Sequence, residues 1–106
     1  MEAKKISDRL SVSGQLSLAD VKQAAEAGFK SVIVNRPDGE GDDQPPFAEI
    51  AAEAKRHGME ARHVPVVPGK ISSADVEAFD RAREELPAPV IGYCRTGTRT
   101  TTLWAL

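Results

Sequence analysis

The chain of 106 residues contains a single cysteine, Cys94. One cysteine excludes an internal disulfide, so its thiol is either a small buried hydrophobic group or a reactive nucleophile. The residue lies between an apolar run and a turn rich in threonine and arginine, in the segment "VIGYCRTGTRTTTLWAL". The choice between the two roles therefore depends on what that segment builds.

Strong net charge and long apolar runs are also missing. The formal net charge is −2, which predicts no nucleic-acid or anionic-membrane partner, because such partners require a basic face. No apolar run approaches the roughly 20 residues of a membrane span, and the start "MEAKKISDRL" has no apolar signal-peptide core. We therefore expect a cytoplasmic protein with no membrane partner.

Histidine is scarce as well, with only His57 and His63 in the chain. His57 is predicted at a helix C-terminus, where a partly cationic side chain suits the helix dipole. Neither histidine has a second ligand at the spacing of a metal site. We therefore predict no metal and no cofactor.

What is present is typical of a soluble globular protein, with 41% hydrophobic and 28% charged residues. Residues 1–106 are expected to form one small domain with a single core. Alternating strand and helix patterns indicate an α/β three-layer sandwich around a mostly parallel sheet of about four to five strands. The expected strands are 9–15, 29–35, 60–67 and 89–94, and the expected helices are 17–28, 46–57 and 72–86, with a last helix from about residue 100.

Local signals support several of these elements. Ser17 with Asp20, and Ser72 with Asp75, have the spacing of a capping box at a helix start. The run 89–94 has almost no polar alternation, so we expect a central strand that is buried on both faces.

Cys94 ends this expected central strand, and "RTGTR" forms the turn into the last helix. In parallel α/β sheets, ligands bind where strands end and helices begin. Backbone N–H groups of a tight turn, a helix N-terminus and the Arg99 guanidinium together suit an anion. The same positive field lowers the pKa of a thiol, so Cys94 is predicted to be a nucleophile near neutral pH.

The predicted anion-binding residues form the turn itself. Gly97 lets the loop curl around a tetrahedral oxyanion. The hydroxyls of Thr98, Thr100 and Thr101 could donate to the thiolate, to the anion or to the leaving sulfur, and Arg95 is expected to face solvent or a substrate. The full predicted anion-binding set is Arg95, Thr96, Gly97, Thr98, Arg99 and Thr100.

At these residues the sequence resembles a known family. "CRTGTRTTTLWAL", with "VIVNRPDGE", "GQLS" and "HVPVVPGKIS", is similar to the β-lactamase-hydrolase-like phosphatases, or domain of unknown function 442, over residues 6–106. The resemblance implies the protein tyrosine/dual-specificity phosphatase fold. It also implies that Cys94 attacks the phosphoryl group, that Arg99 binds its oxygens and that residues 95–98 cradle it. The implied substrate is a phosphorylated small molecule or a phosphoprotein, hydrolysed through a phosphocysteine.

One departure from that pattern leaves other functions open. Most phosphatases of this fold have histidine before the cysteine and five residues between cysteine and arginine. Here Tyr93 precedes Cys94, and four residues separate it from Arg99. That loop length is usual in rhodanese-like sulfurtransferases, so a persulfide carrier linked to sulfide metabolism is an alternative. A noncatalytic regulatory module that binds phosphate or sulfate is a third.

A second departure concerns the general acid that protonates the leaving group. The loop "VPVVPGKISSAD" has apolar residues where dual-specificity enzymes place their aspartate. Asp75 has a sufficient structural reason in its capping box. Asp38 in "NRPDGE" is the other candidate, with turn formation before glycine as its alternative role. The predicted catalytic residues are therefore Cys94, Arg99 and Asp38.

Further charged residues follow the expected strand 29–35. Arg36 could strengthen anion binding or pair with local carboxylates. The acidic run of Glu40, Asp42 and Asp43 is most simply a solvated loop, although it could also repel acidic substrates or close as a lid.

The last helix has little chain after it, since only seven residues follow Arg99. The phosphatase fold normally buries this helix under further structure. We therefore expect either an exposed "LWAL" end, or a longer protein, partner domain or homo-oligomer that covers Leu103, Trp104 and Leu106.

Overall fold

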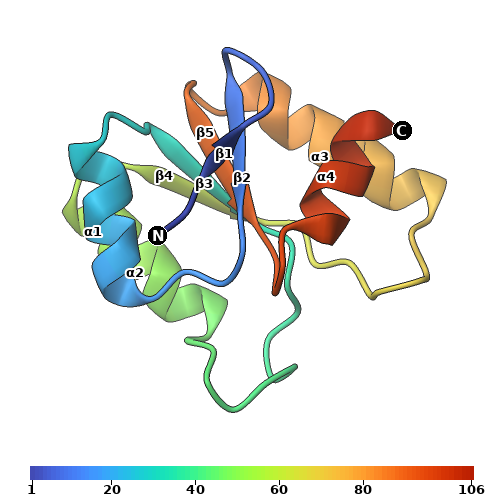
Figure 1. Cartoon of the computed structure of the whole chain (residues 1–106), viewed down its shortest axis with the longest axis horizontal. Coiled ribbons are helices and arrows are strands. Elements are labelled where there is room, and N and C mark those ends of the chain that lie inside the picture. The colour runs from blue at the N-terminus through green and yellow to red at the C-terminus, as the bar shows by residue number, and fades with distance from the viewer.

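The computed structural model describes residues 1–106, which contain five strands. They are β1 (Lys4–Lys5), β2 (Leu10–Ser13), β3 (Ser31–Val34), β4 (Glu60–His63) and β5 (Val90–Tyr93). They form one sheet in the order β1-β2-β5-β3-β4 (Figure 1). The pairs β2·β5, β5·β3 and β3·β4 are parallel, and β1 is antiparallel to β2. The expected, mostly parallel sheet is confirmed.

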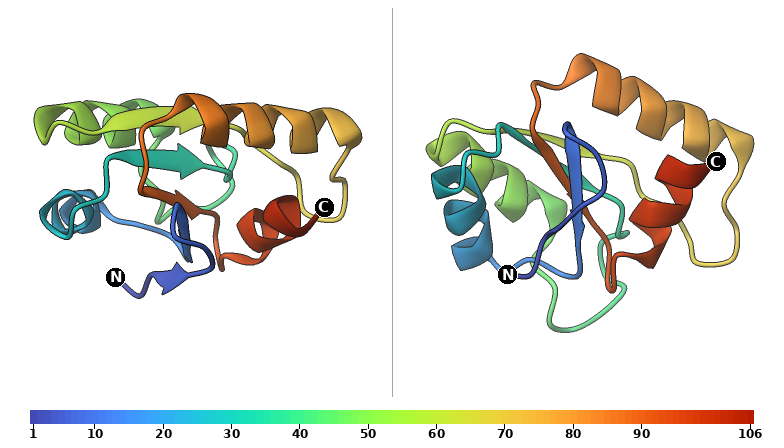
Figure 2. Two further views of the ribbon diagram at one scale, coloured as in Figure 1. Left: turned by 90° about the horizontal axis from the view of Figure 1, so that it is seen from above. Right: turned by 45° about the horizontal axis from the view of Figure 1, so that its top comes forward.

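Four helices cover the sheet: α1 (Leu18–Glu26), α2 (Phe47–Arg56), α3 (Ser73–Glu85) and α4 (Thr98–Ala105). The pair α1 and α2 lies on one side of the sheet, and the pair α3 and α4 lies on the other (Figure 2). The fold is therefore the expected α/β sandwich of three layers.

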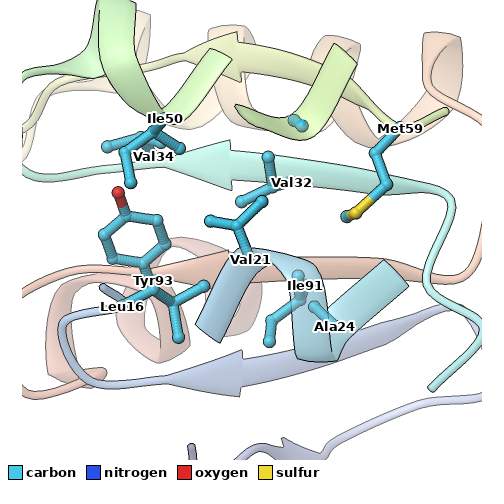
Figure 3. Packing of buried hydrophobic residues seen from close by; sticks show 10 residues of the cluster. Leu16, Val21, Ala24, Val32, Val34, Ile50, Met59, Ile91 and Tyr93 are labelled. Carbon is cyan, nitrogen blue, oxygen red and sulfur yellow. The ribbon is translucent and has the colours of Figure 1, made fainter. Parts of the chain in front are cut away.

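Apolar side chains fill both spaces between the layers. On the side of α1 and α2, Val21 and Ile50 are buried against the sheet, with Tyr93 at the end of the cluster (Figure 3). On the other side, Phe79 of α3 and Leu103 of α4 are fully buried. Full burial of such side chains stabilises a fold by about 1.5–3 kcal/mol each.

The strand β5 occupies the centre of the sheet, and all four of its residues are buried. This confirms the prediction made from its unbroken apolar sequence, because a strand covered by helices on both faces has no polar side. The position matters for function, since the residue that follows β5 is Cys94.

The helix starts follow the capping signals in the sequence. In α1 the Ser17 hydroxyl accepts from the Asp20 N–H at 3.1 Å, and the Asp20 carboxylate accepts from the Ser17 N–H at 2.9 Å. The same reciprocal pair joins Ser72 and Asp75 at the start of α3. Both capping boxes are confirmed.

Two element boundaries differ from the sequence predictions. The strand β1 was not expected, because its lysines are exposed and no apolar alternation marks an edge strand of two residues. The helix α4 begins at Thr98 and not near Thr100, because Gly97 takes a left-handed conformation with φ of 90° and acts as its N-cap.

The end of α4 is only partly covered. Leu103 is fully buried by this chain itself, so only part of the "LWAL" end is exposed. Trp104 and Leu106 are exposed by 38% and 69%. No helix of the structure combines the length and apolar composition needed to cross a bilayer.

Gly92 allows α4 to lie close to the central strand. A Cβ at this position would lie 2.8 Å from Thr100 Cγ2, inside the normal contact distance. Thr100 cannot easily turn away, because its hydroxyl donates to Asn35 at 2.8 Å. The absence of a side chain at residue 92 therefore sets the distance between β5 and α4.

We predict that Gly92→Ala lowers the free energy of unfolding by about 1–3 kcal/mol, as overpacking does in other cores. Gly92→Ala combined with Thr100→Ser removes the clashing methyl but keeps the hydroxyl, so the double variant should lose less than the two single losses together. Urea denaturation of the four proteins measures this. Additive losses would show that the contact does not set the spacing.

Candidate active site

The carboxyl ends of the four parallel strands meet at one edge of the sheet. In register, Tyr93 pairs with Ser13 of β2 and with Val34 of β3, and Val34 pairs with His63 of β4. The loops that follow these strands therefore converge around the residue after Tyr93. That residue is Cys94, which is fully buried.

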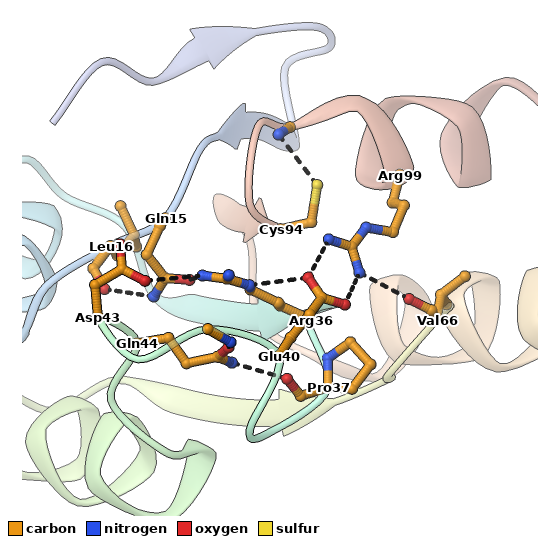
Figure 4. Close-up of polar contacts among 12 residues, drawn as sticks. Gln15, Leu16, Arg36, Pro37, Glu40, Asp43, Gln44, Val66, Cys94 and Arg99 are labelled. Carbon is orange, nitrogen blue, oxygen red and sulfur yellow. Dashed lines mark hydrogen bonds and ion pairs between the residues drawn. The ribbon is translucent and has the colours of Figure 1, made fainter. Parts of the chain in front are cut away.

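The Cys94 sulfur faces backbone N–H groups of the turn into α4. The Gly97 N–H donates to it at 3.1 Å (Figure 4). Burial alone raises the pKa of the Cys94 thiol, but hydrogen bonds from the backbone N–H groups of Thr100, Thr96, Arg99 and Gly97 outweigh burial and hold it below its ordinary value. The thiolate that the sequence predicts is thus favoured here by backbone donors.

The turn is possible because glycines stand where backbone segments touch. Gly97 has a φ of 90°, and a Cβ there would lie 3.3 Å from the Ser13 carbonyl oxygen. A Cβ on Gly14 would lie 3.1 Å from the Arg95 carbonyl oxygen. The Gln15 N–H donates to that same carbonyl at 3.1 Å, so the segment after β2 packs against the Cys94 loop and is hydrogen-bonded to it.

The threonine hydroxyls of the turn are occupied by the chain itself. The Thr101 hydroxyl donates to the Gly97 carbonyl at 2.9 Å, and the Thr98 and Thr96 hydroxyls share a hydrogen bond of 3.1 Å. Neither arrangement places a hydroxyl on the Cys94 sulfur. The predicted donation from these hydroxyls to the thiolate is therefore not present in this structure.

The Thr100 hydroxyl has a partner that the sequence did not reveal. It donates to the Asn35 side-chain oxygen at 2.8 Å, while the Asn35 side-chain nitrogen donates to the Val64 carbonyl at 2.9 Å. The Asn35 backbone also donates to Tyr93 and accepts from Val66. Asn35 is fully buried and connects the ends of three strands to the first turn of α4. Because the Thr100 hydroxyl is bound to Asn35, Thr100 contacts the Cys94 sulfur through its backbone N–H.

Arg99 is held by a carboxylate from a distant loop. Its Nη1 and Nη2 atoms donate to the two oxygens of Glu40 at 2.8 and 2.7 Å, and Nη1 also donates to the Val66 carbonyl at 3.0 Å (Figure 4). Glu40 is exposed, as expected for a solvated acidic loop, but its pairing with Arg99 was not predicted. The hydrogen bonds from Arg99, with those from Arg36, hold the pKa of Glu40 below its ordinary value despite partial burial.

These contacts leave one edge of the Arg99 guanidinium available. A guanidinium has five N–H donors in a planar fork. Both hydrogens of Nη1 and one of Nη2 are used by Glu40 and Val66, so the Nε–H and the second Nη2 hydrogen remain. These two donors lie on the same side and can bind an oxyanion in a bidentate way. The charge of Cys94 also raises the pKa of Arg99, after the larger effect of Glu40, so the thiol lies close to this guanidinium.

Arg36 pairs with carboxylates, which is one of the two roles left open for it. Its Nε donates to Glu40 at 3.0 Å, its Nη1 donates to the Gln15 side-chain oxygen at 2.8 Å, and Asp43 lies 4.0 Å away. Arg36 is buried, so this network is a fixed part of the site. Glu40 and Gln15 were both missed as site residues, although each lies in a segment that follows a parallel strand.

Asp38 has a structural partner in this conformation. Its carboxylate accepts from the Phe47 N–H at 2.8 Å, at the start of α2. Asp38 and Gly39 also form a turn, which was the alternative to catalysis for this residue. The catalytic role of Asp38 stays a prediction.

A hollow of about 530 Å³ opens beside Arg99. We call it the mouth hollow, because Arg95 and Arg99 of the Cys94 loop both lie in its wall. The lining residues are Arg36, Glu40, Gly41, Asp43, Pro68, Arg95 and Arg99.

The chain is similar to known proteins over nearly all of its length. The family model described as "Beta-lactamase hydrolase-like protein, phosphatase-like domain" matches residues 2–106. A "Beta-lactamase hydrolase-like protein" of Agrobacterium fabrum is 39% identical over 106 residues, which are 100% of this chain and 25% of that protein. The chain thus spans about a quarter of the length of the curated relatives it matches.

Solved structures agree with this similarity. A candidate phosphatase from Neisseria meningitidis is 41% identical with a TM-score of 0.88, and the match covers 95% of this chain and 72% of that one. The active form of Tk-PTP is 24% identical with a TM-score of 0.64, over 90% of this chain and 63% of that one, and it shows the fold alone. The fold is therefore that of the protein tyrosine phosphatase-like enzymes, as the resemblance implied.

We predict that Glu40→Gln lowers the free energy of unfolding by about 1–3 kcal/mol at neutral pH, because charged hydrogen bonds are lost. Since the pKa of Glu40 is lowered by folding, this stabilisation is complete above its ordinary value of 4.5 and disappears as the pH falls through the folded value. The difference between wild type and variant should therefore shrink below about pH 4.5 in urea denaturation. Glu85→Gln, which breaks an exposed ion pair with Arg62, is the control and should change little. A difference that is constant with pH would contradict the role of Glu40.

We predict that the Cys94 thiol ionises below its ordinary value of 9.0 and that Gly97→Ala raises its pKa, because the variant strains the turn and displaces one donor to the sulfur. The thiolate absorbance in the ultraviolet, taken as the difference from Cys94→Ser, follows this ionisation. Burial raises the pKa of Tyr93 above its ordinary value of 10.0, so the only tyrosine does not interfere. An unchanged midpoint in Gly97→Ala would show that backbone donation is not the cause.

Proposed function

Since this chain belongs to the family of phosphatase-like domains of beta-lactamase hydrolase-like proteins, we propose that it hydrolyses phosphate esters through a phosphocysteine on Cys94. The observation that carries the proposal is the environment of the Cys94 sulfur. It has a backbone N–H of Gly97 at 3.1 Å and the Arg99 guanidinium beside it, at the end of the central strand. A thiolate and an oxyanion require the same donors.

The proposed reaction has two steps. The Cys94 thiolate attacks phosphorus, a sulfur–phosphorus bond forms and the ester oxygen leaves with its electron pair. Backbone N–H groups of the turn and the available edge of Arg99 bind the other phosphoryl oxygens, whose charge they stabilise in the transition state. Water then attacks phosphorus, which releases phosphate and returns the thiolate.

The leaving group decides which esters react fast. Acid catalysis typically contributes about 10²- to 10⁴-fold, and an alkoxide depends on it most. Asp38 is our proposed acid, and its carboxylate must leave the Phe47 N–H before it can protonate a leaving group. Aryl phosphates are therefore the better substrates among simple esters.

The length of the Cys94 loop supports a second candidate function. Four residues separate Cys94 from Arg99, as in rhodanese-like sulfurtransferases. In that reaction the thiolate takes the outer sulfur of thiosulfate, and sulfite leaves. A module that only binds phosphate or sulfate would use the same donors without turnover.

We predict that the chain hydrolyses an aryl phosphate such as 4-nitrophenyl phosphate and that Cys94→Ser abolishes this activity while it still binds inorganic phosphate. The backbone donors and Arg99 remain in that variant, so binding and chemistry separate. Incubation with thiosulfate, followed by mass measurement of the intact protein, tests for one added sulfur atom on Cys94.

Each proposed function has its own pattern of results. Equal hydrolysis by Cys94→Ser would show that Cys94 is not the nucleophile. A persulfide with no phosphate release would favour the sulfurtransferase, and phosphate binding with neither product would favour the noncatalytic module.

A further inference from the structure

The space around the Cys94 loop is polar. The mouth hollow beside Arg99 is lined by three arginines and two carboxylates, with Pro68 as its least polar member. Four hollows border residues 95–99, and none of the four has phenylalanine, tyrosine or tryptophan in its wall. Sites for aromatic ligands are mostly lined by apolar and aromatic side chains. A phosphotyrosine ring would find no such wall here.

Arg95 differs from the other two arginines of the mouth. Arg36 and Arg99 are buried and paired with Glu40, whereas Arg95 is exposed and forms no ion pair. Its backbone is nevertheless fixed, because its carbonyl accepts from the Gln15 N–H at 3.1 Å. Arg95 therefore lies in the wall of the mouth hollow with a fixed backbone and an unpaired guanidinium.

Proton donors are scarce at this mouth. Glu40 donates no proton while it accepts three hydrogen bonds from Arg36 and Arg99, and Asp43 lies 4.0 Å from Arg36. Asp38 is engaged with the Phe47 N–H. A substrate whose leaving group departs as a stable anion needs none of them. A phosphate group is such a leaving group, because its second pKa is about 6.

We propose, on the basis of the proposed phosphatase function, that Arg95 binds a second anionic group of the substrate and that the preferred substrates are diphosphates. The Cys94 thiolate attacks the terminal phosphorus, and the bond from that phosphorus to the bridging oxygen breaks. The remaining phosphate leaves with the electron pair, held by Arg95. Water then hydrolyses the phosphocysteine to a second phosphate.

The binding experiment uses the Cys94→Ser chain, which does not turn over, with inorganic phosphate and inorganic pyrophosphate in metal-free buffer. Calorimetry should give a dissociation constant for pyrophosphate at least tenfold below that for phosphate. Adding Arg95→Ala should reduce this ratio about tenfold or more, the size expected for a lost charge-assisted hydrogen bond. Arg95→Lys keeps the charge and should restore part of the ratio.

Arg81→Ala is the matched control. Arg81 is exposed on α3, and its substitution removes the same net charge as Arg95→Ala. Its ratio should equal that of Cys94→Ser alone. The proposal is overturned if phosphate and pyrophosphate bind equally, if Arg95→Ala weakens both by the same factor, or if Arg81→Ala lowers the ratio as much as Arg95→Ala does.

An activity measurement separates this proposal from the proposed function. With an active Cys94, Arg95→Ala should reduce kcat/KM for pyrophosphate about tenfold more than for 4-nitrophenyl phosphate. Loss of all phosphate release would refute the phosphatase function while the binding ratio still decides whether Arg95 recognises a second anion. Equal losses on both substrates would refute the diphosphate preference alone.

Discussion

The pair between Arg99 and Glu40 is the interaction on which the arrangement of the site depends. It joins the start of α4 to a loop that lies 59 residues earlier in the chain. A partly buried bidentate pair costs desolvation energy, so it stabilises only when its other hydrogen-bonding positions are satisfied. Here Arg36 and the Val66 carbonyl satisfy them. The pair occupies the Nη1 and Nη2 edge of Arg99 and leaves the Nε and Nη2 edge available for an anion.

The second constraint on the site is the electrostatic environment of Cys94. The Cys94 sulfur is fully buried, and burial by itself disfavours a thiolate. The thiolate is favoured only because backbone N–H groups of the turn point at the sulfur and outweigh the burial. These donors are fixed by the left-handed Gly97 and by the start of α4, so they need no rearrangement when charge develops on a bound phosphoryl group. In the proposed reaction, the nucleophile and the oxyanion therefore share one preorganised set of donors.

Much of the fold is encoded in short stretches of sequence. Capping boxes at Ser17 and Ser72 start two helices, and the unbroken apolar run of β5 identifies the central strand. These signals are readable because a cap involves four consecutive residues and a strand pattern repeats every two. The position of Cys94 directly after that strand follows in the same way. The two-residue strand β1 is not readable, since its pairing with β2 leaves no apolar pattern in its own residues.

The sequence by itself determined the sandwich, its central strand and a cysteine turn suited to an anion, because each depends on residues close together in the chain. Only the tertiary structure decided the partners of that turn. Glu40 reads as one more acid in a polar loop, and Asn35 reads as the end of a strand. Their contacts with Arg99 and Thr100 span 59 and 65 residues. Such contacts depend on how the strand ends align in the sheet and on the close approach of α4 at Gly92, which no local pattern records.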